Sequence, residues 1–359
     1  MRLHYLLRVV LTLLLALGAA VACVALRTPL PWMIGPLVAT ALVSMAGLPT
    51  QSWGPLRNGG QWVIGAALGL YFTPQVTALV ASVWWAILLA IAWALLLGLG
   101  FSAVLYRLHA PRLPQVEPNA MRATAFFAGA VGAASEMTLL AERVGARTDL
   151  VAAAHSLRLM VVVLVIPFGL QASGLTGVDV TPAGPRVVHP AGLAALCACT
   201  GAGALLMRRL GRANPWFMGA LVAAMGITMA GVTWSAIPVW LSNAAQLVIG
   251  VSLGVRFTSG FLHTAPRWLA SVALGTLVMM VLCAGFAWLL AKATGLHPVT
   301  LLLGTSPGGI TEMSITAKVL QLGVPVVTAF QVCRLVAVLL LVNPLWHALE
   351  AQRARGADR

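Results

Sequence analysis

The sequence is poor in charged residues, and above all in acidic ones. Of its 359 residues, 8 are Asp or Glu and 22 are Lys or Arg, so 8% of the chain is charged. Hydrophobic residues make up 60%, and the mean hydropathy is +0.95. So few polar side chains cannot cover a soluble body of this size. The composition therefore predicts an integral membrane protein.

Signatures of catalysis, metal binding and nucleic-acid binding are also missing. The seven histidines are scattered, and none pairs with another at the helical spacing typical of a metal site. The chain has no phosphate-binding loop and no nucleophile elbow. Its net charge of +14 is spread along the chain without a basic, aromatic-rich cluster, so basic cytoplasmic loops explain it better than nucleic acid does. We expect no enzyme activity, no metal and no cofactor.

Three motifs occur twice in the same order, at offsets of 184, 185 and 176 residues. Chance would not keep three motifs at such similar separations, so the sequence contains an internal duplication with two repeats of roughly 160 residues. The motifs are Pro-Trp-x-x-Gly, a Gln followed by two Gly at intervals of four, and a Glu-Met pair whose Glu precedes an Arg by 22 residues. The copies are Pro31 and Pro215, Gln61 and Gln246, and Glu136 and Glu312.

Apolar runs of about 17 to 25 residues predict membrane-spanning helices. We expect an all-α polytopic membrane protein with about ten transmembrane helices in two repeats, each with a broken or re-entrant segment. The predicted spans are 6–26, 33–49, 59–79, 82–106, 149–171, 190–207, 216–233, 241–259, 268–291 and 325–346, and the interrupted stretches are 122–145 and 299–321. The predicted division is 1–171 for membrane repeat 1, 172–189 for an inter-repeat loop, 190–348 for membrane repeat 2 and 349–359 for a basic cytoplasmic tail.

The distribution of Lys and Arg selects between two topologies, because these residues accumulate in cytoplasmic loops. Arg158 and Arg334 lie within predicted helices and are left out of the count. Of the other 20, five crossings per repeat place 16 inside and 4 outside, whereas six crossings give 11 inside and 9 outside. Five crossings also invert the second repeat relative to the first, as in many secondary transporters. The sequence thus predicts a multi-pass membrane protein with both termini in the cytoplasm.

Two carboxylates and two guanidiniums fall within these apolar segments. A charged side chain near the bilayer centre costs about 2.5 to 3.5 kcal/mol, so it usually faces a cavity or a partner. In one interpretation, Arg158 and Arg334 bind or balance an anion while Glu136 and Glu312 carry protons. In the other, each Glu neutralises an Arg and the pair only orients helices. The position of both glutamates in interrupted segments favours the functional interpretation.

The interruption is strongest in the second repeat. Pro307 removes a backbone donor and the two following glycines loosen the chain, so a continuous helix is disfavoured. A half-helix starting after Pro307 would direct its positive end at a cavity, which suits an anion. The first repeat has no proline at this place, so a small-residue packing face is the stronger alternative there. The predicted substrate or ion site comprises Glu136, Glu312, Arg158, Arg334, Ser135, Thr311, Pro307, Gly308 and Gly309.

The Gln and Gly motif forms a stripe of small residues on one helix face. This spacing lets helices approach closely, so helix packing is the expected role, and a hydrogen bond between helices is the expected role of the glutamines. The predicted packing residues are Gln61, Gly65, Gly69, Gln246, Gly250 and Gly254.

Together these motifs resemble the AbrB-type bacterial membrane family, over about residues 10–348. The resemblance implies a polytopic inner-membrane protein with this duplication. Members of that family are labelled as regulators of gene expression or as ammonia monooxygenases, and they differ from the soluble DNA-binding proteins of the same name. Pro307, Gly308, Gly309, Glu312 and Met313 match its motif, and the first copy keeps Gly132, Glu136 and Met137.

The leading hypothesis is a secondary transporter for a small anionic or polar solute, coupled to protons. The alternative, which the resemblance implies, is a membrane-embedded regulator of gene expression that acts through another protein. A copper monooxygenase would need a histidine-rich site that this sequence does not contain. The expected partners are the lipid bilayer, a small-molecule or ion substrate and, as an open option, a second copy in a homodimer, with no direct contact to nucleic acid.

Overall fold

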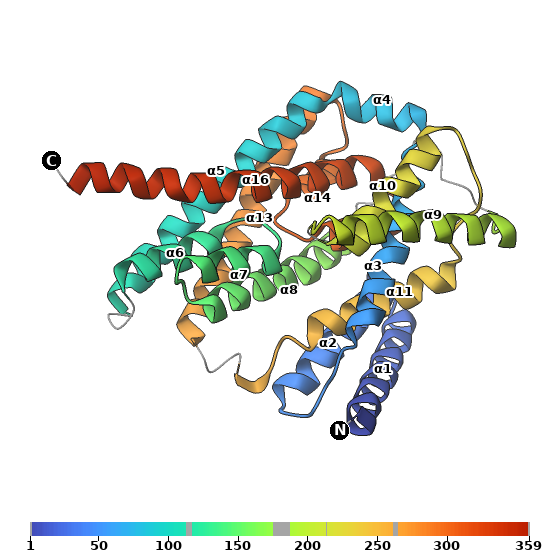
Figure 1. Ribbon diagram of the computed structural model, residues 1–359, viewed down its shortest axis with the longest axis horizontal. Coiled ribbons are helices and arrows are strands. Elements are labelled where there is room, and N and C mark those ends of the chain that lie inside the picture. Colours follow the sequence, from blue (N-terminus) through green and yellow to red (C-terminus); the bar gives the residue numbers. More distant parts are fainter. Residues whose placement is uncertain (1, 113–116, 175–186, 213, 261–264, 358–359) are drawn as a thin grey trace. The chain divides into compact units, whose positions relative to one another are not determined.

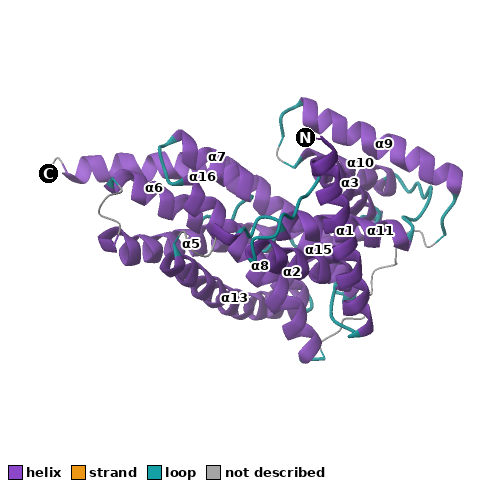
Figure 2. Ribbon diagram, turned by 90° about the horizontal axis from the view of Figure 1, so that it is seen from below, coloured by secondary structure: helices purple, strands orange, loops and turns teal. Residues whose placement is uncertain are grey.

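The computed structural model describes residues 2–112, 117–174, 187–212, 214–260 and 265–357. Within these ranges every regular element is a helix (Figure 2). The helices labelled in Figure 1 and their neighbours are α1 (Arg2–Ala25), α2 (Pro31–Met45), α3 (Gly54–Gly69), α4 (Pro74–Ser82), α5 (Trp84–His109), η1 (Ala110–Arg112), α6 (Pro118–Gly129), α7 (Ala134–Arg143), α8 (Thr148–Ala172), α9 (Pro190–Arg209), α10 (Pro215–Met229), α11 (Val239–Gly254), α13 (Pro266–Thr294), α14 (Pro298–Thr305), α15 (Ile310–Val319) and α16 (Val324–Ala357).

The described residues include six helices that are long and apolar enough to cross a membrane, namely α1, α5, α8, α9, α13 and α16. The shorter helices α2, α10 and α11 are also apolar. The predicted run 59–79 is instead a bent pair, in which α3 and α4 meet at 87° and could count as a seventh span. Pro74 opens α4 because it lacks a backbone donor and fits the first turn of a helix. The all-helical architecture agrees with the predicted polytopic membrane protein.

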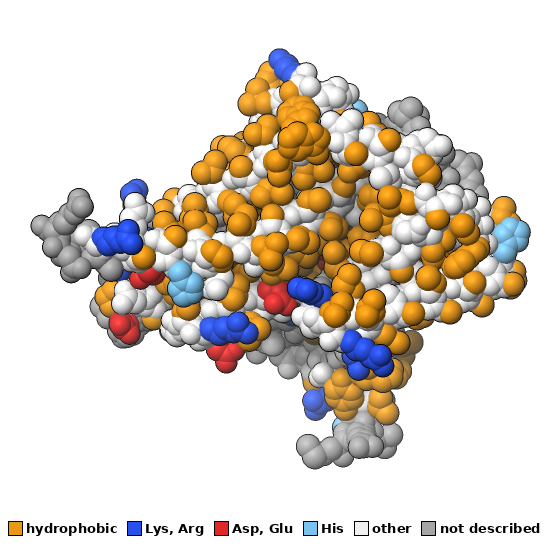
Figure 3. Space-filling view, turned by 45° about the horizontal axis from the view of Figure 1, so that its top comes forward, with side chains coloured by type: hydrophobic (Ala, Val, Ile, Leu, Met, Phe, Trp, Pro, Cys, Tyr) orange, Lys and Arg blue, Asp and Glu red, His pale blue; other side chains and the backbone are white. Residues whose placement is uncertain are grey.

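Side chains on the surface agree with a lipid environment. Hydrophobic side chains cover much of the face shown in Figure 3, and charged side chains are few on it. On α1, large apolar residues such as Leu7, Leu11 and Leu14 are more than half exposed. Exposed apolar surface on this scale is rare in soluble monomers and is expected where the solvent is hydrocarbon.

Contacts divide the chain into two compact units, and each unit contains helices from both sequence repeats. Unit 1 holds the first helices of each repeat, and unit 2 holds most of the interrupted stretches and the larger part of the last helix of each repeat. Unit 1 comprises Met1–Ser82, Val163–Thr264 and Ile310–Thr328, and unit 2 comprises Val83–Val162, Ala265–Gly309 and Ala329–Arg359. The predicted inter-repeat loop 172–189 lies largely outside the described residues.

In unit 1 the glycine helix of each repeat packs on the Pro-Trp helix of the other repeat: α3 on α10, and α11 on α2. A Cβ atom at Gly69 would lie 2.7 Å from the carbonyl oxygen of Leu221, and one at Gly254 would lie 2.7 Å from that of Leu37. These contacts are copies of each other, since Leu221 follows Leu37 at the offset of the Pro-Trp motif. Only a residue without a side chain permits such an approach of two backbones.

Unit 2 is organised around α5, which packs on α6 and on α13. Trp93 of α5 stacks on Phe286 of α13, with 4.8 Å between ring centroids. At the other end of α5, the buried His109 ring bonds the Ser271 hydroxyl at 3.0 Å and meets Trp268 edge to face. These contacts fix α5 against α13 and position α6 and α14, the first halves of the two interrupted stretches.

Candidate functional site

Both interrupted stretches are broken helices, and the halves of the first, α6 and α7, are labelled in Figure 1. α6 and α7 are separated by residues 130–133, and α14 and α15 by residues 306–309. The first residue of each break, Ala130 or Ser306, has an extended conformation with ψ of 134° or 149°, which ends the helix before it. The first break forms without a proline, so contacts from elsewhere must maintain it.

A buried arginine supplies those contacts in the first repeat. Arg158 of α8 is 4% exposed and donates from Nη1 to the carbonyl oxygen of Ala130 at 3.0 Å, with that of Ala128 at 3.5 Å. Its Nη2 donates to Nδ1 of His155, one turn earlier on the same helix, at 2.7 Å. The guanidinium therefore lies at the carboxyl end of α6 and binds carbonyls that the helix leaves without a partner.

The second repeat has the same arrangement. Arg334 of α16 is 5% exposed and donates from Nη1 to the carbonyl oxygen of Ser306. From Nη2 it donates to the carbonyl oxygen of Gly308 at 2.8 Å and to Oε1 of Gln331 at 2.6 Å. Its Nε, in contrast, is buried and has no acceptor among the described residues.

These two arrangements, here named the first clamp (His155 and Arg158) and the second clamp (Gln331 and Arg334), correspond at the 176-residue offset. Ala130 and Ser306, which accept from the two arginines, are related by the same offset. A guanidinium suits this position because it has five donors, and its positive charge is favoured at the negative end of a helix.

The residue three positions before each arginine completes its clamp. His155 Nε2 bonds the carbonyl oxygen of Phe127 at 2.9 Å, and Gln331 Nε2 donates to that of Leu303 at 2.6 Å. Because a carbonyl only accepts and a guanidinium only donates, His155 must carry its proton on Nε2 and accept at Nδ1. A neutral histidine and a glutamine thus present the same donor and the same acceptor.

Sequence reasoning missed His155 and Gln331. In the sequence alone, His155 is one of seven scattered histidines and Gln331 is one of several glutamines in apolar runs. The signal was present, because His-x-x-Arg and Gln-x-x-Arg recur at the offset that relates the two glutamates. His155 and Gln331 differ as residues but are equivalent in their hydrogen-bonding groups.

The arginines are held by carbonyls rather than by the glutamates. In the described part of the chain, the ion pairs are Arg147–Asp149 at 2.6 Å and Arg353–Glu350 at 2.7 Å, both between partly exposed side chains. Arg158 and Glu136 both belong to unit 2, yet they form no ion pair there. The structure therefore favours helix capping over mutual Glu–Arg neutralisation as the structural role of Arg158.

The two glutamates occupy matching positions in the first turns of α7 and α15, in different surroundings. Glu136 is partly exposed and follows the exposed Ser135 in unit 2. Glu312 is 6% exposed and follows the buried Thr311 in unit 1.

Two more buried hydroxyl residues, Ser314 and Thr316, lie in the same helix α15. Arg256 and Arg57 of unit 1 attract the Glu312 carboxylate electrostatically, without forming an ion pair. Pro307, Gly308 and Gly309 lie in unit 2, so the division between the units falls immediately before Ile310.

Comparisons with known proteins show the family to which the chain belongs. The family model described as "Transition state regulatory protein AbrB" matches residues 32–350. The chain is 25% identical to "Uncharacterized protein YhjN" of Bacillus subtilis (strain 168), covering 91% of this chain and 89% of that protein. It is 27% identical to "Putative regulator AbrB" of Escherichia coli (strain K12), covering 92% of each. No solved structure matches the chain.

Proposed function

We propose that this chain, which belongs to the family described as transition state regulatory protein AbrB, is a secondary transporter for a small anionic or polar solute. The proposal includes about ten membrane crossings in two inverted repeats, both termini in the cytoplasm of a bacterial cell, coupling to protons, and no enzymatic activity. The regulator name of the relatives provides the competing proposal, in which the same membrane architecture senses a ligand.

The observation that carries the proposal is the duplicated break with its arginine clamp. Unpaired backbone at membrane depth is tolerated only inside protein or beside a water-filled cavity. Secondary transporters build their solute sites from discontinuous helices in two related repeats. In this chain one buried arginine per repeat binds a carbonyl oxygen at the break: Arg158 binds that of Ala130, and Arg334 binds that of Ser306.

The chemistry around the second break supports an anionic or acceptor-bearing solute. The buried Nε–H of Arg334 has no acceptor among the residues that the structure describes, and leaving such a donor unpaired costs roughly 1 to 3 kcal/mol. A carboxylate, phosphate or carbonyl oxygen of the solute would satisfy it.

Proton coupling is assigned to Glu312. Its side chain is 6% exposed and takes part in no ion pair among the described residues. Burying a carboxylate without an ion pair is costly, and the attraction of Arg256 and Arg57 offsets part of that cost, so a proton or a further cation at Glu312 would be favoured. Glu136, which is partly exposed, is proposed as the weaker contributor.

Thiol labelling from each face of the membrane tests the proposal without knowledge of the solute. The five native cysteines are replaced, and single cysteines are introduced as Thr311→Cys and Ser135→Cys. A matched control is Thr316→Cys, in the same helix as Thr311 and fully buried. Reactivity is measured in right-side-out and inverted vesicles, with and without a proton gradient.

A transporter predicts that Thr311→Cys reacts with a water-soluble reagent and that the reactive face changes with the gradient, while Thr316→Cys stays unreactive. Adding Glu312→Gln should abolish the gradient dependence. Absence of labelling at both positions, from either face, would mean that the breaks are dry. The regulator proposal would then lead.

A further inference from the structure

Unit 2 contains a cavity of about 380 Å³ that is basic at one end and apolar at the other. Arg107 of α5, Arg122 of α6 and Arg353 of α16 line it, with the aromatic rings of Tyr106 and Trp346. This cavity shares no residue with either clamp.

The lining follows from helix periodicity. On α5, the lining residues recur every three to four positions from Leu99 to Arg107, which places them on one face of the helix. On α16, they recur in the same way from Trp346 to Arg353. Each helix thus presents a stripe whose outer end is basic and whose inner end is apolar.

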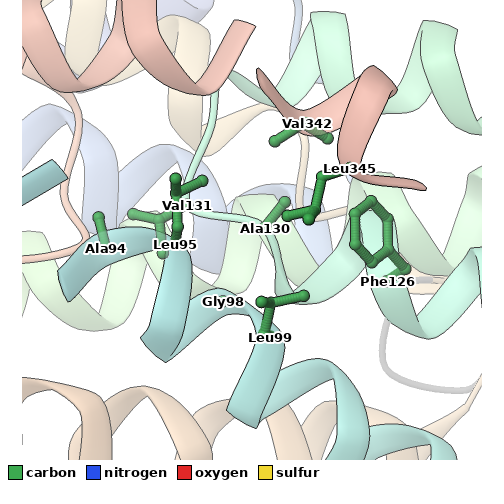
Figure 4. A pocket seen from close by; sticks show the side chains of 9 residues that line it. All are labelled: Ala94, Leu95, Gly98, Leu99, Phe126, Ala130, Val131, Val342 and Leu345. Atoms are coloured by element: carbon green, nitrogen blue, oxygen red, sulfur yellow. The ribbon is translucent and has the colours of Figure 1, made fainter. Parts of the chain in front are cut away.

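The apolar end continues into a second hollow. Leu99 and Phe126 line both spaces, and the second has only aliphatic neighbours beyond Phe126, among them Ala94 and Val342 (Figure 4). Its volume is about 10 Å³, the space that one water molecule needs, so it is a small apolar hollow that cannot enclose an acyl chain. From Ala94 to Arg107, α5 rises about 20 Å, whereas the hydrocarbon layer of one leaflet is about 15 Å thick. The distance between the apolar hollow and the basic end is therefore similar to the depth of one leaflet.

The basic end has the groups that bind phosphate. Guanidiniums match phosphate oxygens with paired donors. Arg122 is oriented by two contacts. Its Nη1 donates to Asn119 Oδ1 at 3.1 Å, and its Cζ lies over the Tyr106 ring, 5.8 Å from the centroid. Glu350 bonds Arg353 at 2.7 Å, so three cations face one carboxylate and the cavity keeps a net positive charge.

We propose that this cavity binds one anionic phospholipid. The phosphate lies among Arg107, Arg122 and Arg353, the aromatic rings flank the glycerol region as they do at membrane interfaces, and the acyl chains leave the cavity at its apolar end, beside Leu99 and Phe126. The positive-inside distribution places this end at the cytoplasmic leaflet, where anionic lipid attracts basic side chains. The assignment is independent of whether the protein transports a solute.

The test is titration of the purified full-length protein with phosphatidylglycerol or with phosphatidylethanolamine, with bound lipid counted by native mass spectrometry. The variant Arg107→Gln, Arg122→Gln, Arg353→Gln removes the charge. A matched control changes three exposed arginines outside the cavity: Arg143→Gln, Arg209→Gln, Arg267→Gln. Ala103→Trp fills the cavity from the exposed side of α5 without changing charge.

Wild type and the matched control should retain one phosphatidylglycerol and prefer it to phosphatidylethanolamine. The cavity triple variant should lose at least about tenfold in phosphatidylglycerol affinity, and Ala103→Trp should also lose binding. Equal binding of the two lipids, or equal losses in the two triple variants, would overturn the proposal. Displacement of the lipid by free glycerol phosphate would instead identify a soluble phosphate ligand. If the triple variant does not fold, unchanged binding by Ala103→Trp overturns the assignment.

Discussion

The two breaks follow one plan with different residues. In the second, Pro307 and two glycines precede α15, and Arg334 has close contacts to two carbonyls. In the first there is no proline, and Arg158 has one close carbonyl contact and one at 3.5 Å. After a duplication, the hydrogen-bond pattern at a helix end has therefore been kept while the residues that produce it have diverged.

The same comparison separates structure from chemistry. Both clamps are buried, whereas the glutamates that follow the breaks differ, since Glu312 is buried and Glu136 is partly exposed. The two arginine clamps are thus nearly equivalent in the two repeats, whereas the two glutamates are not. Experiments that treat the two copies in parallel can measure this difference.

The largest effect is expected from Arg334→Met. The carbonyls of Ser306 and Gly308 would lose their charged donor, and the buried oxygen of Gln331 would be unpaired, at a cost of about 4 kcal/mol of unfolding free energy. Thermal unfolding in detergent measures this. Arg334→Lys should recover part of the loss, because an ammonium keeps the charge without the fork of donors. Full stability of Arg334→Met would show that the second clamp does not hold the break.

A smaller loss, about 3 kcal/mol, is expected from Arg158→Met. One of its two carbonyl contacts is long, so less hydrogen bonding is lost than at Arg334. The same thermal measurement, made on both variants together, ranks the clamps. A loss larger than that of Arg334→Met would reverse the comparison.

The glycine contacts in unit 1 provide a symmetric reference. Gly69→Ala and Gly254→Ala each place a Cβ atom 2.7 Å from a carbonyl oxygen, so each should cost about 2 kcal/mol, and the two losses should be equal. Gly100→Ala on α5 has open space and should not lower the melting temperature, because alanine favours a helix more than glycine does. Unequal losses would show that asymmetry extends beyond the breaks.

The smallest effect is expected from exchanging the clamp partners. His155→Gln and Gln331→His keep one donor and one acceptor, so each should cost less than about 1 kcal/mol. His155→Leu serves as the contrast, because it leaves the Phe127 carbonyl without this donor. If His155→Gln were as damaging as His155→Leu, hydrogen-bond equivalence would not explain the pair.

Much of the fold could be predicted because the length of an apolar run and the repetition of a motif can be recognised from the sequence alone. Every predicted span overlaps a helix or the bent pair of α3 and α4, but only six of the described helices are long and apolar enough to cross a membrane. The bend itself was missed, since hydropathy averages over Pro74 and does not register one backbone donor. The pairing of each glycine helix with the Pro-Trp helix of the other repeat depends on tertiary contacts, which periodicity alone does not encode.

The candidate site was only partly accessible from sequence. The arginines and glutamates stood out because charge is costly in an apolar segment. The carbonyl oxygens that accept from the arginines could not be recognised, because backbone carbonyls have no signature in the sequence. They become available only where a helix ends. The break in the first repeat, without a proline, is the position where composition was least informative and the distant Arg158 was decisive.

The interchange of histidine and glutamine in the clamps has a consequence for how the gene could diverge. Codons for the two amino acids share their first two bases and differ only in the third. A single-base change therefore converts one clamp into the other, and no intermediate residue has to occupy the position. The two repeats were free to drift apart at this buried site without ever releasing the broken helix.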